Sequence, residues 1–268
     1  MFGSFDRVRT TLAVAVALAL VPISVATAAP AAPQAAQAVE MSVDEILARY
    51  FEVMGGVDAL RSINSMRMTG TLTLGEGMEA GFVNTSVRPN KNRMEFVIQG
   101  MTGIQAYDGE TAWMFMPFMG QQAPEPMPAD MAASVMRQAD IDGPLMNYAD
   151  KGHTVEVVGM ADVEGTEAIE LKVTMADGHV QRYYLDAEYF VPLKVVSMET
   201  MGGVEFEQSQ LMSDYKEVGG LLVPLSIQIV TPQGTQSMTA DKIEINVEID
   251  ESIFSMPESA EQQDAQRP

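Results

Sequence analysis

The sequence predicts a mainly β protein with a few helices, an α+β fold in which one strongly curved antiparallel sheet forms an incomplete barrel of about 11 strands. Short strand-like runs recur between turn signals along most of the chain. Pairs such as Asp108-Gly109 and Gly202-Gly203 supply the positive-φ residues that tight hairpins need. No long helical pattern separates the runs, which argues against a parallel α/β enzyme.

The composition is that of a folded, acidic protein. Of its 268 residues, 47% are hydrophobic and 20% are charged, which is enough apolar material for a core. The formal net charge of −21 opposes an encounter with a phosphate backbone, so we expect no nucleic-acid binding. Cysteine is absent from the sequence, which excludes disulfides, thiolate metal sites and a lipid anchor on an N-terminal cysteine.

The N-terminus resembles a secretory signal peptide. Arg7 and Arg9 precede an apolar run over residues 12–21, and Ala26-Thr27-Ala28 offers a small-residue cleavage site. A membrane anchor is the alternative, but a spanning helix needs roughly 20 apolar residues. We therefore expect residues 1–28 to be cleaved and the mature protein to be soluble, periplasmic and not lipid-anchored.

One domain is expected between two polar ends. Residues 29–40 form an Ala/Pro/Gln spacer and residues 258–268 a polar tail, and both contain too few large apolar groups to pack. The spacer is expected to be flexible and the tail disordered. The domain then covers residues 41–257 and is expected to be monomeric.

An amphipathic helix opens this domain. Ser42 and Glu45 have the spacing of a capping box, and Gly55-Gly56 ends the pattern. The apolar side chains that follow the cap fall on one helical stripe: Ile46, Leu47, Tyr50, Phe51 and Met54.

Alternation with a period of two begins at Ser65, where Met66, Met68, Leu72 and Leu74 share one face of a half-buried strand. Similar runs follow between turns, and each is expected to be one strand of the sheet. They cover residues 78–88, 92–99, 103–107, 111–116, 153–158, 166–175, 179–186, 192–201, 204–213, 221–231 and 235–246.

The segment between Met116 and His153 interrupts the strands. It contains five prolines and a short helical pattern at Met131, Val135 and Met136. A loop of this length in a compact domain is commonly a functional lid or a disordered segment. Its apolar helical face favours a helical lid that packs on the sheet.

The sequence offers no catalytic or metal-binding motif. His153 and His179 are its two histidines, and neither belongs to such a motif. Asp140 and Asp142 resemble a fragment of a calcium loop without its remaining ligands. Closely spaced Met114, Met116 and Met119 could hold Cu(I), but their apolar neighbours favour burial. We therefore expect no catalytic residue, no metal and no cofactor.

Methionine is unusually abundant, with 22 residues. A flexible thioether adapts to variable apolar shapes, so this composition suits an adaptable cavity. A Met-rich core explains it equally well, and composition does not decide between the two.

Several motifs together resemble the periplasmic carriers of outer-membrane lipoproteins, the LolA-like family. Arg88-Pro89-Asn90 is followed by an apolar strand, and Tyr107-Asp108-Gly109 by a strand that contains Trp113. Further similar positions are Tyr184-Leu185-Asp186, Pro192-Leu193-Lys194, Asp214-Tyr215, Gly219-Gly220, Pro224 and residues 254–257. The resemblance spans roughly residues 43–257.

The resemblance implies an incomplete barrel that encloses an apolar cavity for acyl chains. It implies that Arg88 hydrogen-bonds to the lid and holds the empty cavity closed, where a surface arginine that ends a strand before Pro89 is the alternative. Trp113 is expected in the cavity wall, where ordinary core packing is its alternative. The expected lining is Met66, Met68, Leu72, Met94, Phe96, Ile98, Trp113, Phe115, Met131, Val135 and Met136.

The function expected from this resemblance is carriage, without chemistry. A soluble periplasmic protein would shield the acyl chains of a lipoprotein, or of a related lipid-like ligand, on the way to the outer membrane. Its partners would be an inner-membrane ABC transporter and an outer-membrane receptor. The alternative is a regulatory sensor of the same fold that signals through a partner protein. An enzyme of unrecognised type is a third possibility, but the sequence contains no paired carboxylates that identify an acid or a base.

Overall fold

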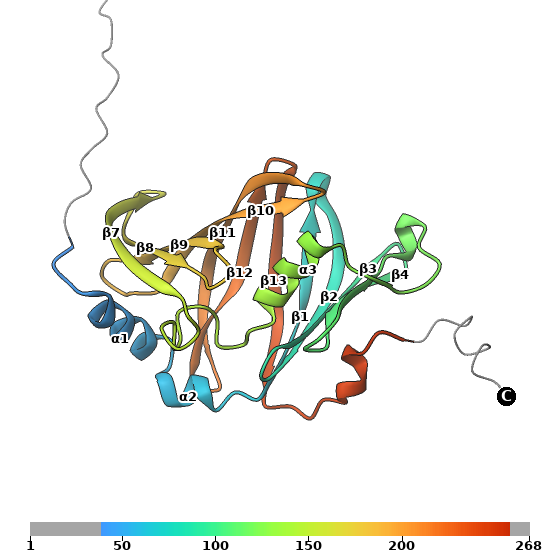
Figure 1. Cartoon of the computed structure of the whole chain (residues 1–268), viewed down its shortest axis with the longest axis horizontal. Coiled ribbons are helices and arrows are strands. Elements are labelled where there is room, and N and C mark those ends of the chain that lie inside the picture. Colours follow the sequence, from blue (N-terminus) through green and yellow to red (C-terminus); the bar gives the residue numbers. More distant parts are fainter. Residues whose placement is uncertain (1–38, 258–268) are drawn as a thin grey trace, which may run out of the picture. The chain divides into compact units, whose positions relative to one another are not determined.

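A computed structural model describes residues 39–257, and a thirteen-stranded antiparallel sheet dominates it (Figure 1). The strand order is β6-β5-β4-β3-β2-β1-β13-β12-β11-β10-β9-β8-β7. Strands that are neighbours in sequence therefore pair with each other, except β6 and β7, which lie at the two edges of the sheet. The first strand, β1, also pairs with the last, β13. The expected signal peptide, most of the spacer and the C-terminal tail lie outside the described residues.

The elements follow the predicted runs closely. The strands are β1 (Ser65–Leu74), β2 (Met78–Val87), β3 (Lys91–Ile98), β4 (Met101–Tyr107), β5 (Ala112–Phe115), β6 (Glu125–Pro126), β7 (Thr154–Val163), β8 (Thr166–Thr174), β9 (Val180–Asp186), β10 (Pro192–Met201), β11 (Val204–Val218), β12 (Leu221–Thr231) and β13 (Gly234–Ile245). The helices are α1 (Val43–Val53), α2 (Val57–Arg61) and α3 (Ala129–Gln138), with short 3₁₀ turns η1 (Gly75–Gly77), η2 (Pro117–Met119) and η3 (Glu251–Phe254).

The curved, mainly β fold is confirmed, with thirteen strands where a total of about 11 was expected. The twelve runs predicted individually correspond to β1–β5 and β7–β13. One element that the sequence did not predict is β6, whose two residues pair with β5 from within the expected lid. Two residues cannot show an alternating pattern. Helix α2 was also missed, because five residues are too few to form a helical stripe.

The predicted capping box begins α1. Ser42 Oγ accepts a hydrogen bond from the backbone N–H of Glu45, and a side-chain oxygen of Glu45 accepts one from the N–H of Ser42 at 2.8 Å. The helix ends before Gly55, which has a φ of 118°. A Cβ atom at Gly55 would lie 2.4 Å from the carbonyl oxygen of Gly220. Both the positive φ and this close contact therefore require glycine.

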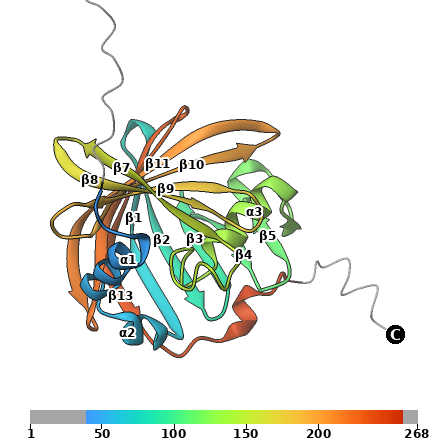
Figure 2. The ribbon, with the colours of Figure 1, turned by 60° about the vertical axis from the view of Figure 1, so that its left-hand side comes forward.

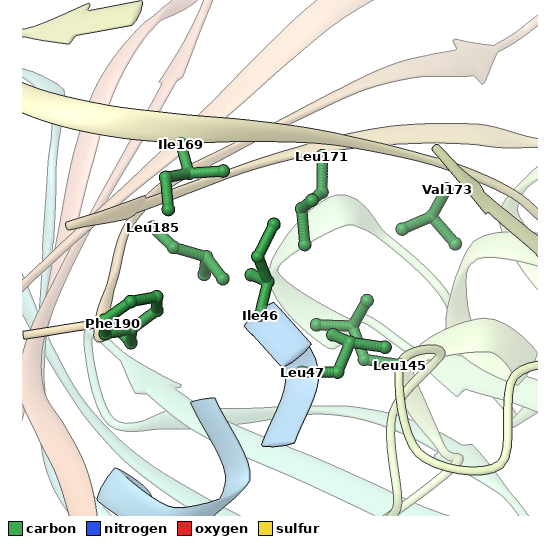
Figure 3. Close-up of a cluster of buried hydrophobic side chains, with 8 residues drawn as sticks. All are labelled: Ile46, Leu47, Leu145, Ile169, Leu171, Val173, Leu185 and Phe190. Atoms are coloured by element: carbon green, nitrogen blue, oxygen red, sulfur yellow. The ribbon is translucent and has the colours of Figure 1, made fainter. Parts of the chain in front are cut away.

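The stripe on α1 packs against the β7–β9 end of the sheet. Ile46 and Leu47 are buried there against Leu171, Leu185 and the other side chains in Figure 3. Leu145, from the segment over residues 117–153 that we call the insertion, belongs to the same cluster. One cluster therefore joins the first helix, three strands and the insertion.

The face of the sheet that carries these contacts is called the inner face. Leu171 pairs with Tyr183, and Tyr183 pairs with Val195, so these three side chains point to one side of the sheet. The pairing of the remaining strands places Leu72 on β1 and Met94 on β3 on the same side. Helices α1 and α3 both lie on this side, and α3 lies next to β4 and β5 (Figure 2). Within residues 39–257, no helix has the length and apolarity needed to cross a membrane.

Candidate functional site

A cavity of about 490 Å³ lies between the inner face and α3. Its size falls in the range of roughly 300–1,000 Å³ that is typical of small-molecule sites. The walls come from β1–β4, β12 and β13, and α3 covers one side. The lining residues are Leu72, Leu74, Asn84, Ser86, Asn92, Met94, Phe96, Ile98, Gln105, Val135, Gln138, Ile229, Gln236 and Met238.

Strand register explains why these side chains meet. Asn84, Met94 and Gln105 are direct partners across β2, β3 and β4, so they point to the same side. Leu72 on β1 is likewise the partner of Met238 on β13. Alternation along each strand then places every second residue in the wall.

Five residues of the predicted lining lie in this wall: Leu72, Met94, Phe96, Ile98 and Val135. The three on β3 occur at every second position, which is the signal that the sequence carried. Ligand contact by these residues stays a prediction.

Two more of the predicted residues lie on the correct face but outside the cavity. Met66 and Met68 are the partners of Ser86 and Asn84, yet neither belongs to the lining. Alternation identified their face, but it carries no information on where along the strand the cavity ends.

The predicted methionines of α3 also differ from expectation. Met131 packs in a small cluster with Tyr107 and Ala112, where α3 contacts β4 and β5. Met136 faces away from the main cavity, and 45% of it is exposed. Val135 alone of the three predicted helical residues lines the cavity. Met131 shares its helix face one turn earlier but packs with β4 and β5, and Met136 lies on another face.

The prediction that Trp113 lines the cavity is wrong. The ring is completely buried on the outer face, where Nε1 donates a hydrogen bond to the carbonyl oxygen of Phe254 at 2.6 Å. The guanidinium of Arg93 lies 5.6 Å from the ring centre. Phe115, two residues along the same strand, shares this orientation and is also absent from the lining. The core-packing alternative for Trp113 is therefore correct.

Arg88 contacts the insertion, as the resemblance implies. Its two terminal nitrogens donate hydrogen bonds of 2.6 and 2.9 Å to the two carboxylate oxygens of Asp142. Its Nε donates to the carbonyl oxygen of Ile63 at 2.8 Å. The hydrogen bonds from Arg88 hold the pKa of Asp142 below its usual range, against the opposing effect of burial. Arg88 thus ties the end of β2 both to the start of the sheet and to the insertion.

The calcium hypothesis for this acidic pair has no support in the contacts. Asp142 is paired with Arg88, and Asp140 is paired with Lys151, which also donates to the carbonyl oxygen of Gly143 at 2.7 Å. Both carboxylates therefore neutralise cationic side chains. Nothing in the sequence signals these pairings, because the partners lie 54 and 11 positions apart along the chain.

A second set of polar contacts holds α3 to the other half of the sheet. Arg137 lies 3.2 Å from a carboxylate oxygen of Glu199 on β10 and 3.4 Å from one of Asp177. At the first turn of α3, Asp130 accepts a hydrogen bond from the N–H of Gly202 at 2.7 Å. The helix is therefore anchored at both of its ends to the segment around β9 and β10.

The side chain of His179, which is 9% exposed, lies beside this set. Its Nε2 atom has no hydrogen-bond partner among the described residues and lies 3.6 Å from Glu199. Burial lowers the pKa of His179, and the positive charge of Arg137 lowers it further, while Glu199 and Asp177 oppose the shift. We therefore assign the neutral form to His179 at neutral pH.

No protein-family model matches the sequence, and no curated protein matches it. Solved structures do. A domain from Vibrio parahaemolyticus, described as an outer membrane lipoprotein-sorting protein domain, superposes with a TM-score of 0.53 and 12% identity, over 80% of this chain and 97% of that one. A LolA superfamily protein from Nitrosomonas europaea gives 0.54 and 11%, over 80% and 98%. A DUF1329 family protein from Desulfovibrio piger gives 0.53 and 11%, over 78% and 97%. The chain therefore has the LolA-like fold.

Proposed function

We propose that this protein is a periplasmic carrier that shields the acyl chains of lipoproteins in the cavity under α3. The observation that carries the proposal is the cavity itself. Apolar side chains line its strands, and its cover, which consists of α3 and the rest of the insertion, is held by polar contacts. The shared fold with a lipoprotein-sorting protein domain supports the proposal. The proposed activity is binding and release of the ligand, without a chemical step.

The physical task requires such a cavity. Burial of one methylene contributes about 0.8 kcal/mol, so an acyl chain of about 15 methylenes costs on the order of 10 kcal/mol to expose to water. Free diffusion of an acylated protein between two membranes is therefore excluded. Apolar walls such as Phe96, Ile98 and Met238 remove this cost by covering the chain.

A carrier must also release its cargo. The cover over the cavity is fixed by Arg88–Asp142 on one side and by the contacts of Arg137 on the other. Hydrogen bonds to charged groups contribute about 1.5–3 kcal/mol, which is small beside the burial of an acyl chain. Cargo can therefore displace the cover, and loss of the cargo lets it return.

Cargo would arrive from an inner-membrane ABC transporter and leave to an outer-membrane receptor. The most direct test is to isolate the protein from the periplasm without detergent and to identify bound molecules by native mass spectrometry. A co-purifying lipoprotein supports the proposal and identifies the cargo. A protein that carries nothing, and that also fails to take up a synthetic triacylated lipopeptide, overturns it.

A further inference from the structure

Six of the fourteen residues in the cavity wall are polar. Eight of its residues are apolar, and the other six are Asn84, Ser86, Asn92, Gln105, Gln138 and Gln236. Four of these six lie together on β2, β3 and β4, in the rows that precede Arg88. We call Asn84, Ser86, Asn92 and Gln105 the amide cluster. The apolar residues Leu74 and Ile98 lie at the ends of β1 and β3 that are farther from the amide cluster.

The amide cluster keeps hydrogen-bonding capacity for a ligand. The side-chain nitrogen of Asn92 donates to Oδ1 of Asn84 at 3.0 Å and to Oγ of Ser86 at 2.9 Å. Those two bonds use acceptor oxygens of Asn84 and Ser86, so the Asn84 nitrogen and the Ser86 hydroxyl hydrogen, like the Gln105 amide, make no side-chain hydrogen bond within residues 39–257. These groups are half-buried and line the cavity, so a ligand can meet them there.

The described lining contains no Asp, Glu, Lys, Arg or His. The nearby cations are already paired, Arg88 with Asp142 and Arg137 with Glu199. An ionised head group would therefore lose its hydration without gaining a counter-ion. For an anion, the net charge of −21 adds a further unfavourable potential.

We propose that the cavity selects ligands whose acyl chain is joined to an uncharged ester or amide group, and rejects ionised lipids such as fatty acids. The amide cluster donates to the carbonyl oxygen of the linkage at the Arg88 end, and the chain extends along β3 toward Ile98. This inference rests on the proposed function and narrows its ligand, because the acyl chains of lipoproteins are attached through such neutral linkages.

Displacement of the uncharged fluorophore N-phenyl-1-naphthylamine tests the selectivity. The two competitors are 1-palmitoylglycerol, which is neutral, and palmitate at pH 8, which carries the same acyl chain and a charge. We expect the neutral ligand to bind at least about tenfold more tightly, which corresponds to one or two net hydrogen bonds. Equal or tighter binding of palmitate overturns the inference.

Two variants locate the effect. Replacing both asparagines, N84L with N92L, should weaken 1-palmitoylglycerol about tenfold and leave palmitate within about threefold. The milder S86A should weaken the neutral ligand by roughly threefold and does not challenge folding. The matched control is Q228L, because Gln228 is exposed on the outer face next to the cavity residue Ile229. A loss that is equal for both ligands, or no loss in S86A, overturns the inference.

The outcomes separate the inference from the proposed function. If neither competitor binds and a triacylated lipopeptide is not taken up, the proposed function itself fails. If the lipopeptide binds and 1-palmitoylglycerol does not, the proposed function stands and the selectivity is wrong. Far-ultraviolet circular dichroism and thermal unfolding of each variant show whether it is folded.

Discussion

Replacing Asp142 with alanine should release the insertion from the sheet without unfolding the domain. The carboxylate accepts two hydrogen bonds of 2.6 and 2.9 Å from Arg88, and the side chains of Arg88 and Asp142 are 26% and 18% exposed. A fully buried charged pair of this geometry would contribute more, but partial exposure lets solvent screen it, so we expect a loss of about 2 kcal/mol. The equilibrium for local opening should then rise roughly 30-fold.

Hydrogen exchange with mass spectrometry measures this opening directly, because exchange of amides in the insertion and α3 reports their local stability. The D142A variant should speed exchange there by roughly 30-fold, with little change in β8. The matched control is K172A. It removes the solvent-accessible ion pair between Lys172 and Glu156, whose charged atoms are 3.5 Å apart, and should change exchange in the insertion little. Unchanged exchange over residues 129–152 in D142A would refute the assignment of this pair as the tie.

The same pair predicts a pH dependence. The pKa of Asp142 is lower in the folded protein than in an unfolded chain, where it is about 3.9. Its contribution is therefore present in full above that value and is lost as the pH falls through the lower folded pKa. Exchange in the insertion should rise with acid in the parent, after correction for the intrinsic rate, and D142N should remove this component.

Three further predictions concern residues elsewhere in the domain. His179 has a folded pKa below its unfolded value of about 6.5, so it should lower the free energy of unfolding as the pH falls below 6.5, and urea titrations of H179Q should show a smaller decrease. The W113F variant loses the hydrogen bond to Phe254, so its free energy of unfolding should fall by about 1 kcal/mol. It should bind lipopeptide like the parent, and a binding defect would show that Trp113 contacts the ligand. The I46A variant should lose about 2–5 kcal/mol in urea unfolding, and a loss below 1 kcal/mol would show that α1 does not hold the core.

The sequence was most informative where one periodicity had one physical cause. The stripe that begins at Ile46 and the alternation at Met94, Phe96 and Ile98 each arise from a single buried face, and the structure places them accordingly. Trp113 failed for a related reason. The outer face of β5 is itself covered by η3, so apolar residues occur on both faces of that strand and alternation cannot tell which face lines a cavity.

The ion pairs that hold the insertion to the sheet could not be predicted from the spacing of residues in the sequence. Arg88 and Asp142 are 54 positions apart, and Arg137 and Glu199 are 62 apart, so only the folded sheet brings each pair together. The resemblance pointed to Arg88 but not to its partner. The amide cluster was also missed, because Asn84, Asn92 and Gln105 read as ordinary polar positions until the register places them in one wall.

The proposed function requires acyl chains to occupy the cavity between the inner face and α3. A triacylated lipopeptide with a photoreactive diazirine near the end of one acyl chain tests this most directly, with crosslinked peptides identified by mass spectrometry. If the chains lie there, crosslinks should form to the cavity wall, on the strand segments that contain Leu72, Phe96 and Ile98. Crosslinks confined to the outer face, or none above the level of an irradiated unrelated protein, would contradict the proposed function.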